Sequence, residues 1–440
     1  MKQTVIRLVC SFLCMIYAAA AFASPPTVEE ARVRVLGGVG CMASYEDRNG
    51  QIAEGYLSES GWSIDRYARA KDDVSAEFLI AKKNEAGRDH FLLAVAGTSD
   101  IKDIRLDLKM KQVPYGGDSL ESFRQRAAEP ITKDDPSEMR VHKGFNKLVD
   151  VLLTIEVKTD SGDMRPLIDV LREKEDSTIY LTGHSLGGAA VTILGARLRD
   201  LGVQPEQIHI MTFGAPAVGN EPFARAYESL PLERITMKGD PIVSALQMVA
   251  GGYEQFGTEK KLDEREKSIG IAMSNHAITE YFDVILKDYY DAKGMREGAL
   301  PYAPLHRGST RGTEKIYVLP MEDRIDDRFD KEVPYMQMVM ADVAMMFADG
   351  IVLADTDADW ELRAQEAGCR YVISSSVTNH PLKESYNTHY IVYTQTIYDI
   401  REHRIVSAAS YSTDNRRMTI LESFLHSLFD AYGEQKQLWG

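Results

Sequence analysis

The sequence predicts a two-domain α/β protein in which a mainly parallel central sheet is followed by a smaller C-terminal α/β domain. Two observations support this fold class. Strand-like and helix-like segments alternate between residues 141 and 291, and a segment rich in proline and glycine at 300–313 separates this series from a second set of elements. Alternating strands and helices build βαβ units, whose strands are parallel. A chain of 440 residues that is 44% hydrophobic can bury two or three such cores.

The first domain is expected to begin with a helix and a strand pair. Apolar residues recur at helical spacing from Val28 to Tyr45, and two strands at 76–83 and 90–96 flank a turn at 84–87. The alternating series follows. Its helices are predicted at 145–157, 164–174, 186–201 and 278–291, and its strands at 177–182, 207–213 and 234–238.

The second domain follows a linker. We interpret 300–313 as this linker because it contains two prolines and two glycines and has no hydrophobic periodicity. Beyond it the predicted order is β-α-β-β-β-α. The strands are expected at 315–319, 370–377, 389–398 and 405–411, and the helices at 335–347 and 420–432, with a further helix around 360–367. The five methionines Met336, Met338, Met340, Met345 and Met346 are expected to fill the core beside the sheet.

The first 23 residues have the composition of a secretory signal peptide. Lys2 and Arg7 precede an apolar run at 8–22, which ends in an Ala-x-Ala cleavage pattern. We therefore predict export to the periplasm, the cell envelope or the medium, with domains at 24–299 and 314–440. An uncleaved membrane anchor is the alternative, although the apolar run is short for a span of the bilayer.

The composition excludes some classes of partner. The chain carries 66 acidic and 51 basic residues, a formal charge of −15, and the loss of Lys2 and Arg7 with the signal peptide takes this charge to −17. Such a surface repels nucleic acid and strongly anionic membranes, so neither is an expected main partner. Cys41 and Cys369 remain after cleavage. They are predicted to be inert core thiols, with a single disulfide between them as the alternative.

The segment from Tyr180 to Gly188 carries the main chemical signal. It reads Tyr-Leu-Thr-Gly-His-Ser-Leu-Gly-Gly, so a G-x-S-x-G pattern joins a strand-like run to a helix-like run. At such a turn a serine is held in a strained conformation with its hydroxyl exposed, and the flanking glycines avoid collisions with neighbouring backbone. Ser185 is therefore the candidate nucleophile.

A serine hydroxyl needs a base within hydrogen-bond reach and an acid that orients this base. In enzymes with this type of turn the chain order is serine, acid, histidine. Asp240 follows the strand at 234–238 and is the candidate acid, although its place before Pro241 is also typical of a purely local turn. His276 precedes the long helix and is the candidate base, because His306 lies in the linker and the earlier histidines precede Asp240.

Acyl transfer also needs hydrogen-bond donors for the oxyanion of the tetrahedral intermediate. One donor is the backbone N–H of the residue after the nucleophile, here Leu186. The second donor is expected in a loop after an early strand. The strand at 90–96 leads into Gly97 and Thr98, so Thr98 is the candidate, with an ordinary Gly-Thr turn as the alternative.

Several blocks of the sequence together resemble the class 3 lipases, a family of α/β-hydrolases related to fungal lipases. The blocks are Ala96-Gly97-Thr98, Val141-His142-Lys143-Gly144-Phe145, Gly183-His184-Ser185-Leu186-Gly187-Gly188, Phe213-Gly214-Ala215-Pro216-Ala217-Val218-Gly219-Asn220, Gly239-Asp240-Pro241, and His276 with Tyr281. The resemblance covers about residues 28–293. It implies an α/β-hydrolase fold, a Ser185-Asp240-His276 triad, and an oxyanion hole from Thr98 and Leu186. It also implies hydrolysis of carboxylic esters of lipids, with no metal and no organic cofactor.

The sequence also departs from the family pattern. The family commonly has an aromatic-Arg-Gly-Thr block at the oxyanion strand, where this chain has Val95-Ala96-Gly97-Thr98. No compact apolar lid stands out in the highly charged interval 99–140. A phospholipase A1 or a lipid acyltransferase on the same triad is the alternative among enzymes. Outside enzymes, the alternative is a non-catalytic envelope protein that uses the fold as a binding scaffold.

The C-terminal domain carries no comparable chemistry in its sequence. Its histidines, His380, His389, His403 and His426, are scattered without the spacing of metal ligands. Its order of elements is loosely similar to that of small α/β domains in bacterial envelope lipoproteins. This similarity implies docking to a protein or to a component of the envelope.

Overall fold

The computed structural model describes residues 26–71, 74–97, 111–132, 135–159, 161–250, 252–263, 274–294, 314–346, 348, 350–382, 388–416 and 418–439. The predicted signal peptide at 1–23, the candidate oxyanion residue Thr98 and the predicted linker at 300–313 lie outside the described residues. Within the described ranges, none of the helices combines the length and the apolar composition that a membrane span requires.

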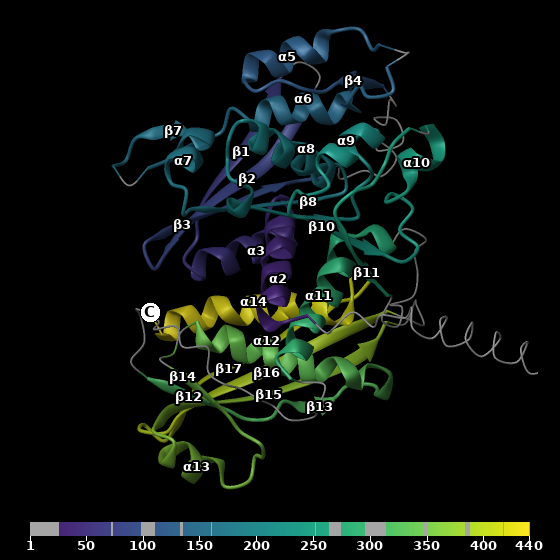
Figure 1. The fold of residues 1–440 in the computed structure, drawn as a ribbon. Coiled ribbons are helices and arrows are strands. Elements are labelled where there is room, and N and C mark those ends of the chain that lie inside the picture. Colours follow the sequence, from purple (N-terminus) through teal and green to yellow (C-terminus); the bar gives the residue numbers. More distant parts are fainter. Residues whose placement is uncertain are drawn as a thin grey trace, which may run out of the picture.

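The first unit is built around a seven-stranded sheet (Figure 1). In sheet order its strands are β1 (Ser63–Lys71), β2 (Val74–Glu85), β3 (Arg88–Val95), β8 (Thr178–His184), β9 (Ile208–Phe213), β10 (Leu232–Met237) and β11 (Thr258–Leu262). The strands from β3 to β11 pair in parallel, whereas β1, β2 and β3 pair antiparallel. The predicted mainly parallel central sheet is confirmed, and so is the early strand pair.

Helices cover both faces of this sheet. On one face lie α2 (Val28–Ala43), α3 (Arg48–Glu59) and α11 (Ile278–Ala292), and on the other lie α6 (Lys143–Leu152) and α8 (Leu186–Asp200). Successive side chains of β3 pack alternately on the two faces of the sheet. Leu92 and Ala94 pack into the cluster of α2 and α11, whereas Phe91 and Leu93 pack into the cluster of α6 and α8. A strand buried on both faces explains why this segment is apolar without alternation.

The structure corrects two predicted helices. The helix predicted at 145–157 ends at Leu152 and is followed by strand β6 (Glu156–Lys158). The helix predicted at 164–174 begins as strand β7 (Met164–Pro166) before α7 (Leu167–Glu173). β6 and β7 pair antiparallel as a small hairpin. Pro166 explains the late start of α7, because proline lacks the N–H that a helix interior requires and restricts the residue before it to extended backbone.

Shorter elements complete the first unit. The helices are α5 (Leu120–Ala128), α9 (Glu221–Ala226) and α10 (Ala245–Ala250), and the small strand pair is β4 (Gln112–Pro114) with β5 (Arg140–His142). The elements α3, β1 and β11 were not predicted from the sequence. The edge strand β11 is Thr-Glu-Lys-Lys-Leu, and such charged edges resemble loops in sequence.

The second unit contains a six-stranded sheet. Its path is β14 (Gly350–Leu353), β12 (Lys315–Val318), β15 (Cys369–Pro381), β16 (His389–Asp399) and β17 (Arg404–Asp414), and β13 (Glu322–Arg324) pairs with β15. Its helices are α12 (Val333–Met345), α13 (Trp360–Glu366) and α14 (Ile420–Trp439). The predicted β-α-β-β-β-α series and the additional helix are confirmed. The structure adds β13 and β14, which are too short to show a periodicity.

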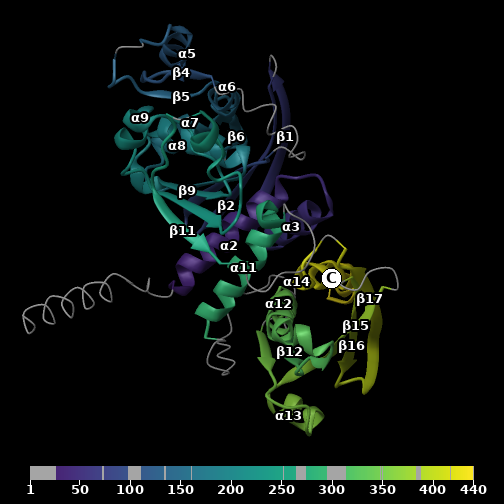
Figure 2. The ribbon, with the colours of Figure 1, turned by 90° about the vertical axis from the view of Figure 1, so that its right-hand side faces the viewer.

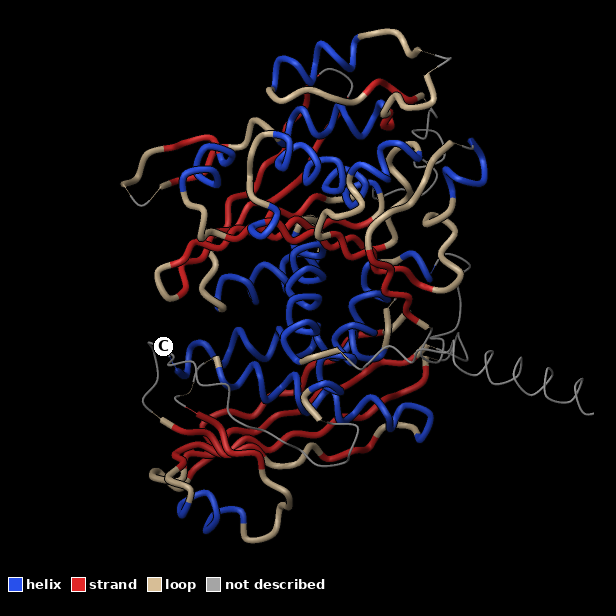
Figure 3. Tube along the Cα trace, in the orientation of Figure 1, coloured by secondary structure: helices blue, strands red, loops and turns tan. Residues whose placement is uncertain are grey.

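The two units meet through helices. Figures 1 and 2 show α12 and α14 on one face of the second sheet, lying against α2, α3 and α11 of the first unit, and Figure 3 shows these helices between the two sheets. One continuous cluster of buried apolar side chains includes residues of both units, from Ala31 and Val35 on α2 to Phe424 and Leu428 on α14. The methionines Met336, Met338 and Met340 on α12 are buried in this cluster, as predicted.

Both cysteines of the described chain are unpaired. Cys41 and Cys369 are buried, and neither forms a disulfide. Sγ of Cys41 lies 3.0 Å from Oγ1 of Thr182, and burial raises the pKa of the Cys41 thiol to about 12. A thiol with such a pKa is protonated at neutral pH and unreactive. The prediction that both cysteines are core thiols without a disulfide is confirmed for the described residues.

The buried side chain of Arg197 on α8 contacts two aromatic residues, Tyr115 after β4 and Phe123 on α5. The guanidinium of Arg197 lies 3.8 Å from the ring centres of both Tyr115 and Phe123, and it donates to the carbonyl of Gly116 and to Oδ1 of Asn146. Burial lowers its pKa from the usual value. We expect Arg197→Leu to lower the free energy of unfolding by about 3 kcal/mol, because it removes both stacking contacts and leaves buried acceptors unpaired. The midpoint of urea denaturation measures this loss.

The matched control is Arg225→Leu on α9, which removes an arginine whose side chain is 74% exposed. This control is expected to change the free energy of unfolding by less than about 0.5 kcal/mol. Equal midpoints for Arg197→Leu and the wild type would show that the stacked arginine does not stabilise the fold.

Candidate active site

The candidate nucleophile lies at a sharp turn between a strand and a helix. β8 ends at His184, α8 begins at Leu186, and Ser185 between them has φ 56° and ψ −123°. A positive φ is uncommon for a residue with a side chain and costs roughly 1–3 kcal/mol, which the surrounding structure must supply. Here the Ser185 N–H donates to the carbonyl of Phe213 on β9, at 2.9 Å. The strained turn that the G-x-S-x-G pattern predicted is therefore present.

A glycine of the pattern allows the helix to approach the sheet. A Cβ on Gly187 would lie 2.1 Å from the carbonyl oxygen of Val95 at the end of β3. This distance is far inside a van der Waals contact, so another side chain at this position would push α8 away from β3. The glycine therefore sets the distance between Ser185 and the end of the early strand.

The candidate acid and the candidate base are hydrogen-bonded to each other. Nδ1 of His276 lies 2.8 Å from Oδ2 of Asp240, and both side chains are buried. Asp240 follows β10, and His276 ends a short 3-10 helix (Ser274–His276) before α11. The side chain of Asn275 donates to the carbonyl of Lys238 and so joins the two loops. Because an ionised carboxylate only accepts, Nδ1 carries the proton and Nε2 keeps its lone pair.

Two further donors fix the carboxylate of Asp240. The hydroxyl of Tyr281 on α11 donates to Oδ2 at 2.6 Å, and the backbone N–H of Ile242 donates to Oδ1 at 2.8 Å. Burial, reinforced by the adjacent Asp240, raises the pKa of Tyr281, so its hydroxyl stays protonated as a donor. The contact with Ile242 is the local turn interaction that the sequence allowed as an alternative role for Asp240. Asp240 therefore makes both the local contact and the contact with His276.

A chain of hydrogen bonds links the end of β3 to the loop of His276. Nε2 of His184 lies 2.6 Å from the carbonyl oxygen of His276, and Nδ1 of His184 lies 2.9 Å from the hydroxyl of Tyr45. The carbonyl can only accept, so Nε2 of His184 donates, and Nδ1 accepts from the Tyr45 hydroxyl. The N–H of Gly97 then donates to the oxygen of Tyr45, at 3.0 Å.

His184 is held in its neutral form. Burial, with the nearby His276 as the second cause, lowers the pKa of His184 to about 3. A neutral imidazole keeps the same donor and acceptor across the physiological pH range. Each hydrogen bond between Gly97 and His276 therefore keeps the same donor and the same acceptor. This hydrogen-bonding role of His184 was not predicted from the sequence. Tyr45, which comes just after α2, carries no sequence signal that would have revealed its place in the site.

In the structure, the candidate nucleophile and the candidate base are not hydrogen-bonded to each other. Oγ of Ser185 and Nε2 of His276 are both buried, and within the described residues neither has a hydrogen-bond partner. Leu186 is the first residue of α8, and Ser185 makes no side-chain capping bond at this helix start. A helix start of this kind offers backbone N–H groups to an anion. Gly97 lies close by, because a Cβ on Gly97 would be 3.2 Å from Cβ of Ser185.

The described residues contain no cluster of three or more histidine, cysteine, aspartate or glutamate side chains placed to hold a metal ion. The chemistry that Ser185, Asp240 and His276 offer is acid-base and nucleophilic. Asp240 and His276 form the oriented pair, and Ser185 presents a hydroxyl without a partner beside the start of α8.

A family model supports the resemblance seen in the sequence. Residues 92–249 match the model "Lipase (class 3)". This range contains the second half of β3, the G-x-S-x-G turn and Asp240, and it ends before His276.

Curated relatives agree with this match. The chain is 34% identical to "Lipase" of Rhizopus niveus over 100 residues, which are 22% of this chain and 25% of the relative. It is 27% identical to "Phospholipase A1-II 1" of Oryza sativa subsp. indica over 194 residues, which are 41% of this chain and 45% of the relative. A third relative is "Secreted mono- and diacylglycerol lipase 2" of Gibberella zeae, 27% identical over 41% of this chain and 45% of the relative. The chain thus spans less than half the length of these relatives.

A solved lipase structure is also similar to part of this chain. The crystal structure of a lipase from Rhizopus microsporus var. chinensis is 19% identical, with a TM-score of 0.39, over 55% of this chain and 80% of that chain. The match of the family model over residues 92–249 is independent of this comparison. Residues 92–249 of the chain are thus similar to the class 3 lipase family.

Proposed function

We propose that the protein hydrolyses carboxylic esters of lipids with Ser185 as nucleophile, His276 as base and Asp240 as the acid that orients His276. The observation that carries the proposal is the buried 2.8 Å contact between Nδ1 of His276 and Oδ2 of Asp240, in a chain whose strained serine precedes both. The match to the lipase family model supports the choice of esters as substrates.

The proposed reaction proceeds through an acyl-enzyme. Oγ of Ser185 attacks the ester carbonyl carbon while Nε2 of His276 takes the hydroxyl proton. The carbonyl oxygen becomes an oxyanion, and the backbone N–H groups of Leu186 and Thr98 are the proposed donors to it. The intermediate collapses, the C–O bond to the alcohol breaks, and His276 returns the proton to the departing alcohol. A water molecule then repeats these steps on the acyl-enzyme and releases the carboxylic acid.

The proposed reaction requires a small rearrangement of the site. Ser185 and His276 are both buried, and their reacting atoms are not hydrogen-bonded to each other. Catalytic hydrogen bonds are often long or unformed in the free enzyme and form when substrate binds. In the proposed mechanism, substrate binding therefore opens access to Ser185 and brings its hydroxyl onto Nε2 of His276.

A fluorophosphonate probe tests the proposed nucleophile without knowledge of the natural substrate. Such a probe reacts with serines that are activated by a neighbouring base. We expect the purified wild-type protein to be labelled on Ser185, as identified by mass spectrometry of the modified peptide, and the heat-denatured protein not to be labelled. Folded protein that remains unlabelled would favour the alternative of a non-catalytic binding scaffold.

Hydrolysis of phospholipids at the sn-1 position is the second candidate activity. The matches to phospholipases A1 of rice extend over 31–54% of this chain, whereas the match to the Rhizopus niveus lipase covers 22%. Parallel assays with a triacylglycerol, a phosphatidylcholine and a p-nitrophenyl ester of the same acyl chain distinguish the candidates. A preference for phosphatidylcholine over triacylglycerol would support the phospholipase; transfer of the acyl group to an added alcohol would indicate an acyltransferase.

Export is part of the same proposal. The signal-like sequence at 1–23 supports it, although the names of the relatives differ in compartment, with one secreted protein of Gibberella zeae and one "chloroplastic/mitochondrial" phospholipase of rice. Export with cleavage predicts a mature protein that begins near Ser24. Sequencing of the N-terminus of the protein from the cell envelope and from the medium tests this prediction.

We expect Tyr45→Phe to slow the reaction through the position of His276. The change removes the hydroxyl that accepts from Gly97 and donates to His184, so the chain that ends on the His276 carbonyl loses a link. A displacement of about 1 Å at a reacting group can cost up to ~10²-fold in rate, so kcat is expected to fall about 10- to 100-fold. KM for a p-nitrophenyl ester is expected to change less than kcat, because the hydroxyl does not touch the acyl group in this proposal.

The control variant is Tyr67→Phe on β1. It removes a tyrosine hydroxyl that donates to the carbonyl of Glu156, on the outer part of the sheet. This variant is expected to keep the kcat of the wild type. A Tyr45→Phe protein with unchanged kcat would show that the hydrogen-bonded chain has no part in positioning His276.

A further inference from the structure

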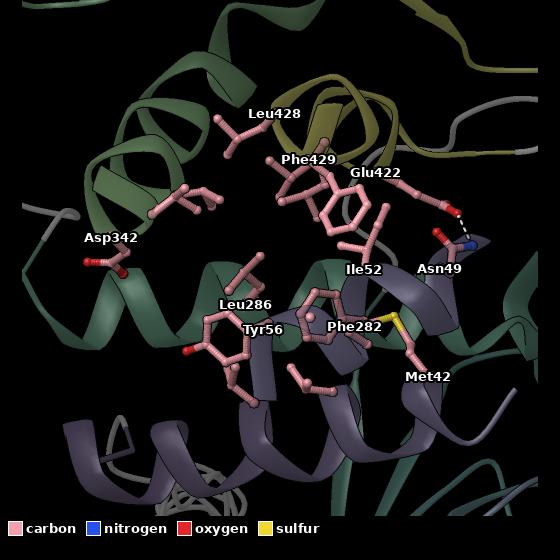
Figure 4. Close-up of a pocket in the computed structure, with 18 of the residues that line it drawn as sticks. Met42, Asn49, Ile52, Tyr56, Phe282, Leu286, Asp342, Glu422, Leu428 and Phe429 are labelled. Atoms are coloured by element: carbon pink, nitrogen blue, oxygen red, sulfur yellow. Dashed lines mark hydrogen bonds between the residues drawn. The ribbon is translucent and has the colours of Figure 1, made fainter. Parts of the chain in front are cut away.

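An apolar cavity lies between the two units, and Ser185 is not part of its lining. It has a volume of about 140 Å³ and is bordered by five helices, α2, α3 and α11 of the first unit and α12 and α14 of the second. Figure 4 shows Ile52, Phe282, Leu286, Leu428 and Phe429 around the central space. An apolar cavity of about 150 Å³ remains dry and accepts benzene, so this space has room for a hydrocarbon ligand of several carbon atoms.

The cavity is long and narrow. Its lining on α3 runs from Asn49 to Glu59, and its lining on α14 runs from Leu421 to Tyr432. With a rise of 1.5 Å per helical residue, each of these stretches spans roughly 15 Å. A volume of about 140 Å³ spread over such a length suits a single aliphatic chain better than a compact ring system. Tyr56 lines the cavity and is 42% exposed, so the cavity reaches the surface beside α3.

Acidic side chains lie at both ends of the cavity. Figure 4 places Asp342 at one end and Glu422, hydrogen-bonded to Asn49, at the other. Among the described residues that line the cavity there is no lysine, arginine or histidine, and the lining contains four carboxyl groups, those of Glu59, Asp283, Asp342 and Glu422. A ligand with a carboxylate or a phosphate monoester head would meet like charge without a cation in the lining.

Glu422 makes one end of the cavity close to neutral. Its side chain is buried, and burial raises its pKa to about 7, whereas the hydrogen bonds from Asn49 and from the N–H of Thr419 act in the opposite direction. On the neighbouring helix α11, Glu280 adds repulsion and Asp283 is paired with Lys287. On α14 itself, His426 is hydrogen-bonded to Oδ1 of the Asn49 amide. Near neutral pH a substantial fraction of the Glu422 carboxyl is protonated, and this form can donate to an uncharged hydroxyl or carbonyl group.

We infer that this cavity binds one aliphatic chain with an uncharged, oxygen-containing head, of the class of a fatty alcohol or a monoacylglycerol. The ligand chain lies along α3 and α14, between the two units, and its head lies at a carboxyl group. The site does not depend on the proposed chemistry at Ser185. Because both units contribute walls, a bound chain adds apolar contacts across their interface and stabilises the pair.

The probe ligands are 1-decanol, 1-hexanol and sodium decanoate, used below their micelle-forming concentrations with the full chain. We expect 1-decanol to raise the midpoint of thermal unfolding in a saturable manner, as any ligand of the folded state does. Each methylene contributes about 0.8 kcal/mol, or about fourfold in affinity, so 1-hexanol is expected to bind about 200-fold more weakly than 1-decanol. Decanoate at pH 8 is expected to bind at least tenfold more weakly than 1-decanol.

Two variants that fill the cavity from opposite walls provide the structural test. Ala53→Leu adds volume from α3, and Val343→Phe adds volume from α12. Each is expected to weaken the binding of 1-decanol more than tenfold without lowering the unfolding midpoint of the free protein. Leu362→Phe is the control, since Leu362 lies on α13 outside the cavity and is 57% exposed. If one of the two filling variants does not fold, the other still tests the site.

The outcomes separate this inference from the proposed function. Ser185→Ala protein is expected to bind 1-decanol with the affinity of the wild type, whatever the activity of the wild type is. No saturable binding of 1-decanol, or equal binding by the wild type and both filled variants, would overturn the site. Binding of decanoate as tight as that of 1-decanol would overturn the uncharged head group.

Discussion

Ser185→Ala is expected to abolish ester hydrolysis, with a fall in kcat on the order of 10⁶-fold. Alanine has no group that can form the acyl-enzyme, so the proposed route is closed at its first step. Alanine and serine tolerate φ 56° about equally, and the buried hydroxyl of Ser185 has no hydrogen-bond partner among the described residues, so the fold is expected to survive the change. The measurement is the initial rate of hydrolysis of a p-nitrophenyl ester, together with the midpoint of thermal unfolding.

The matched control for this prediction is Ser375→Ala on β15. Ser375 is also buried, and its hydroxyl also lacks a partner within the described chain. Any general effect of removing such a hydroxyl would therefore appear in both variants. A Ser185→Ala protein that keeps one tenth or more of the wild-type rate would rule out Ser185 as the nucleophile.

The fold was predictable where a segment is long and buried on both faces. β3 and β8 are apolar over most of their length, and α8 follows β8 after the glycine-rich turn. All residues of such a segment therefore favour the same secondary structure. The errors concern short segments with mixed signals. The end of α6 and the start of α7 were misplaced because Ile155 and Val157 after α6, and Met164 before Pro166, continue an apolar pattern that suits a helix as well as a strand.

The candidate site was predictable to the extent that chain order restricts it. A serine at a G-x-S-x-G turn, an aspartate after a strand and a histidine before a helix follow a known order, and the structure brings Asp240 and His276 into contact. The hydrogen-bonded chain through Tyr45 and His184 was not predictable. Tyr45 and His184 are 139 residues apart, and their contact depends on how α2 packs across β8. No periodicity or local motif records such packing.

Asp240→Asn is the second change with a large expected effect, a fall in kcat of about 10⁴-fold. In the wild type, Oδ2 of Asp240 accepts from both Nδ1 of His276 and the hydroxyl of Tyr281. An amide group in this place presents N–H donors to two groups that also donate. His276 is then expected to release its Nδ1 proton to Nε2, where it blocks the lone pair that takes the proton of Ser185. Measurement of kcat for a p-nitrophenyl ester at pH 8 tests this expectation.

The asparagine variant separates the two roles of Asp240 because it keeps the local one. The oxygen of an asparagine side chain can still accept from the N–H of Ile242, so the turn after β10 is preserved, whereas the acceptor for His276 is lost. Tyr281→Phe is the complementary variant, since it removes one donor and leaves the contact between Asp240 and His276; its kcat is expected to fall about tenfold or less. If Asp240→Asn retains both its fold and its activity, Asp240 has only the local role in the turn. If it retains its fold and loses its activity, the carboxylate acts through His276, because the turn is the same in both proteins.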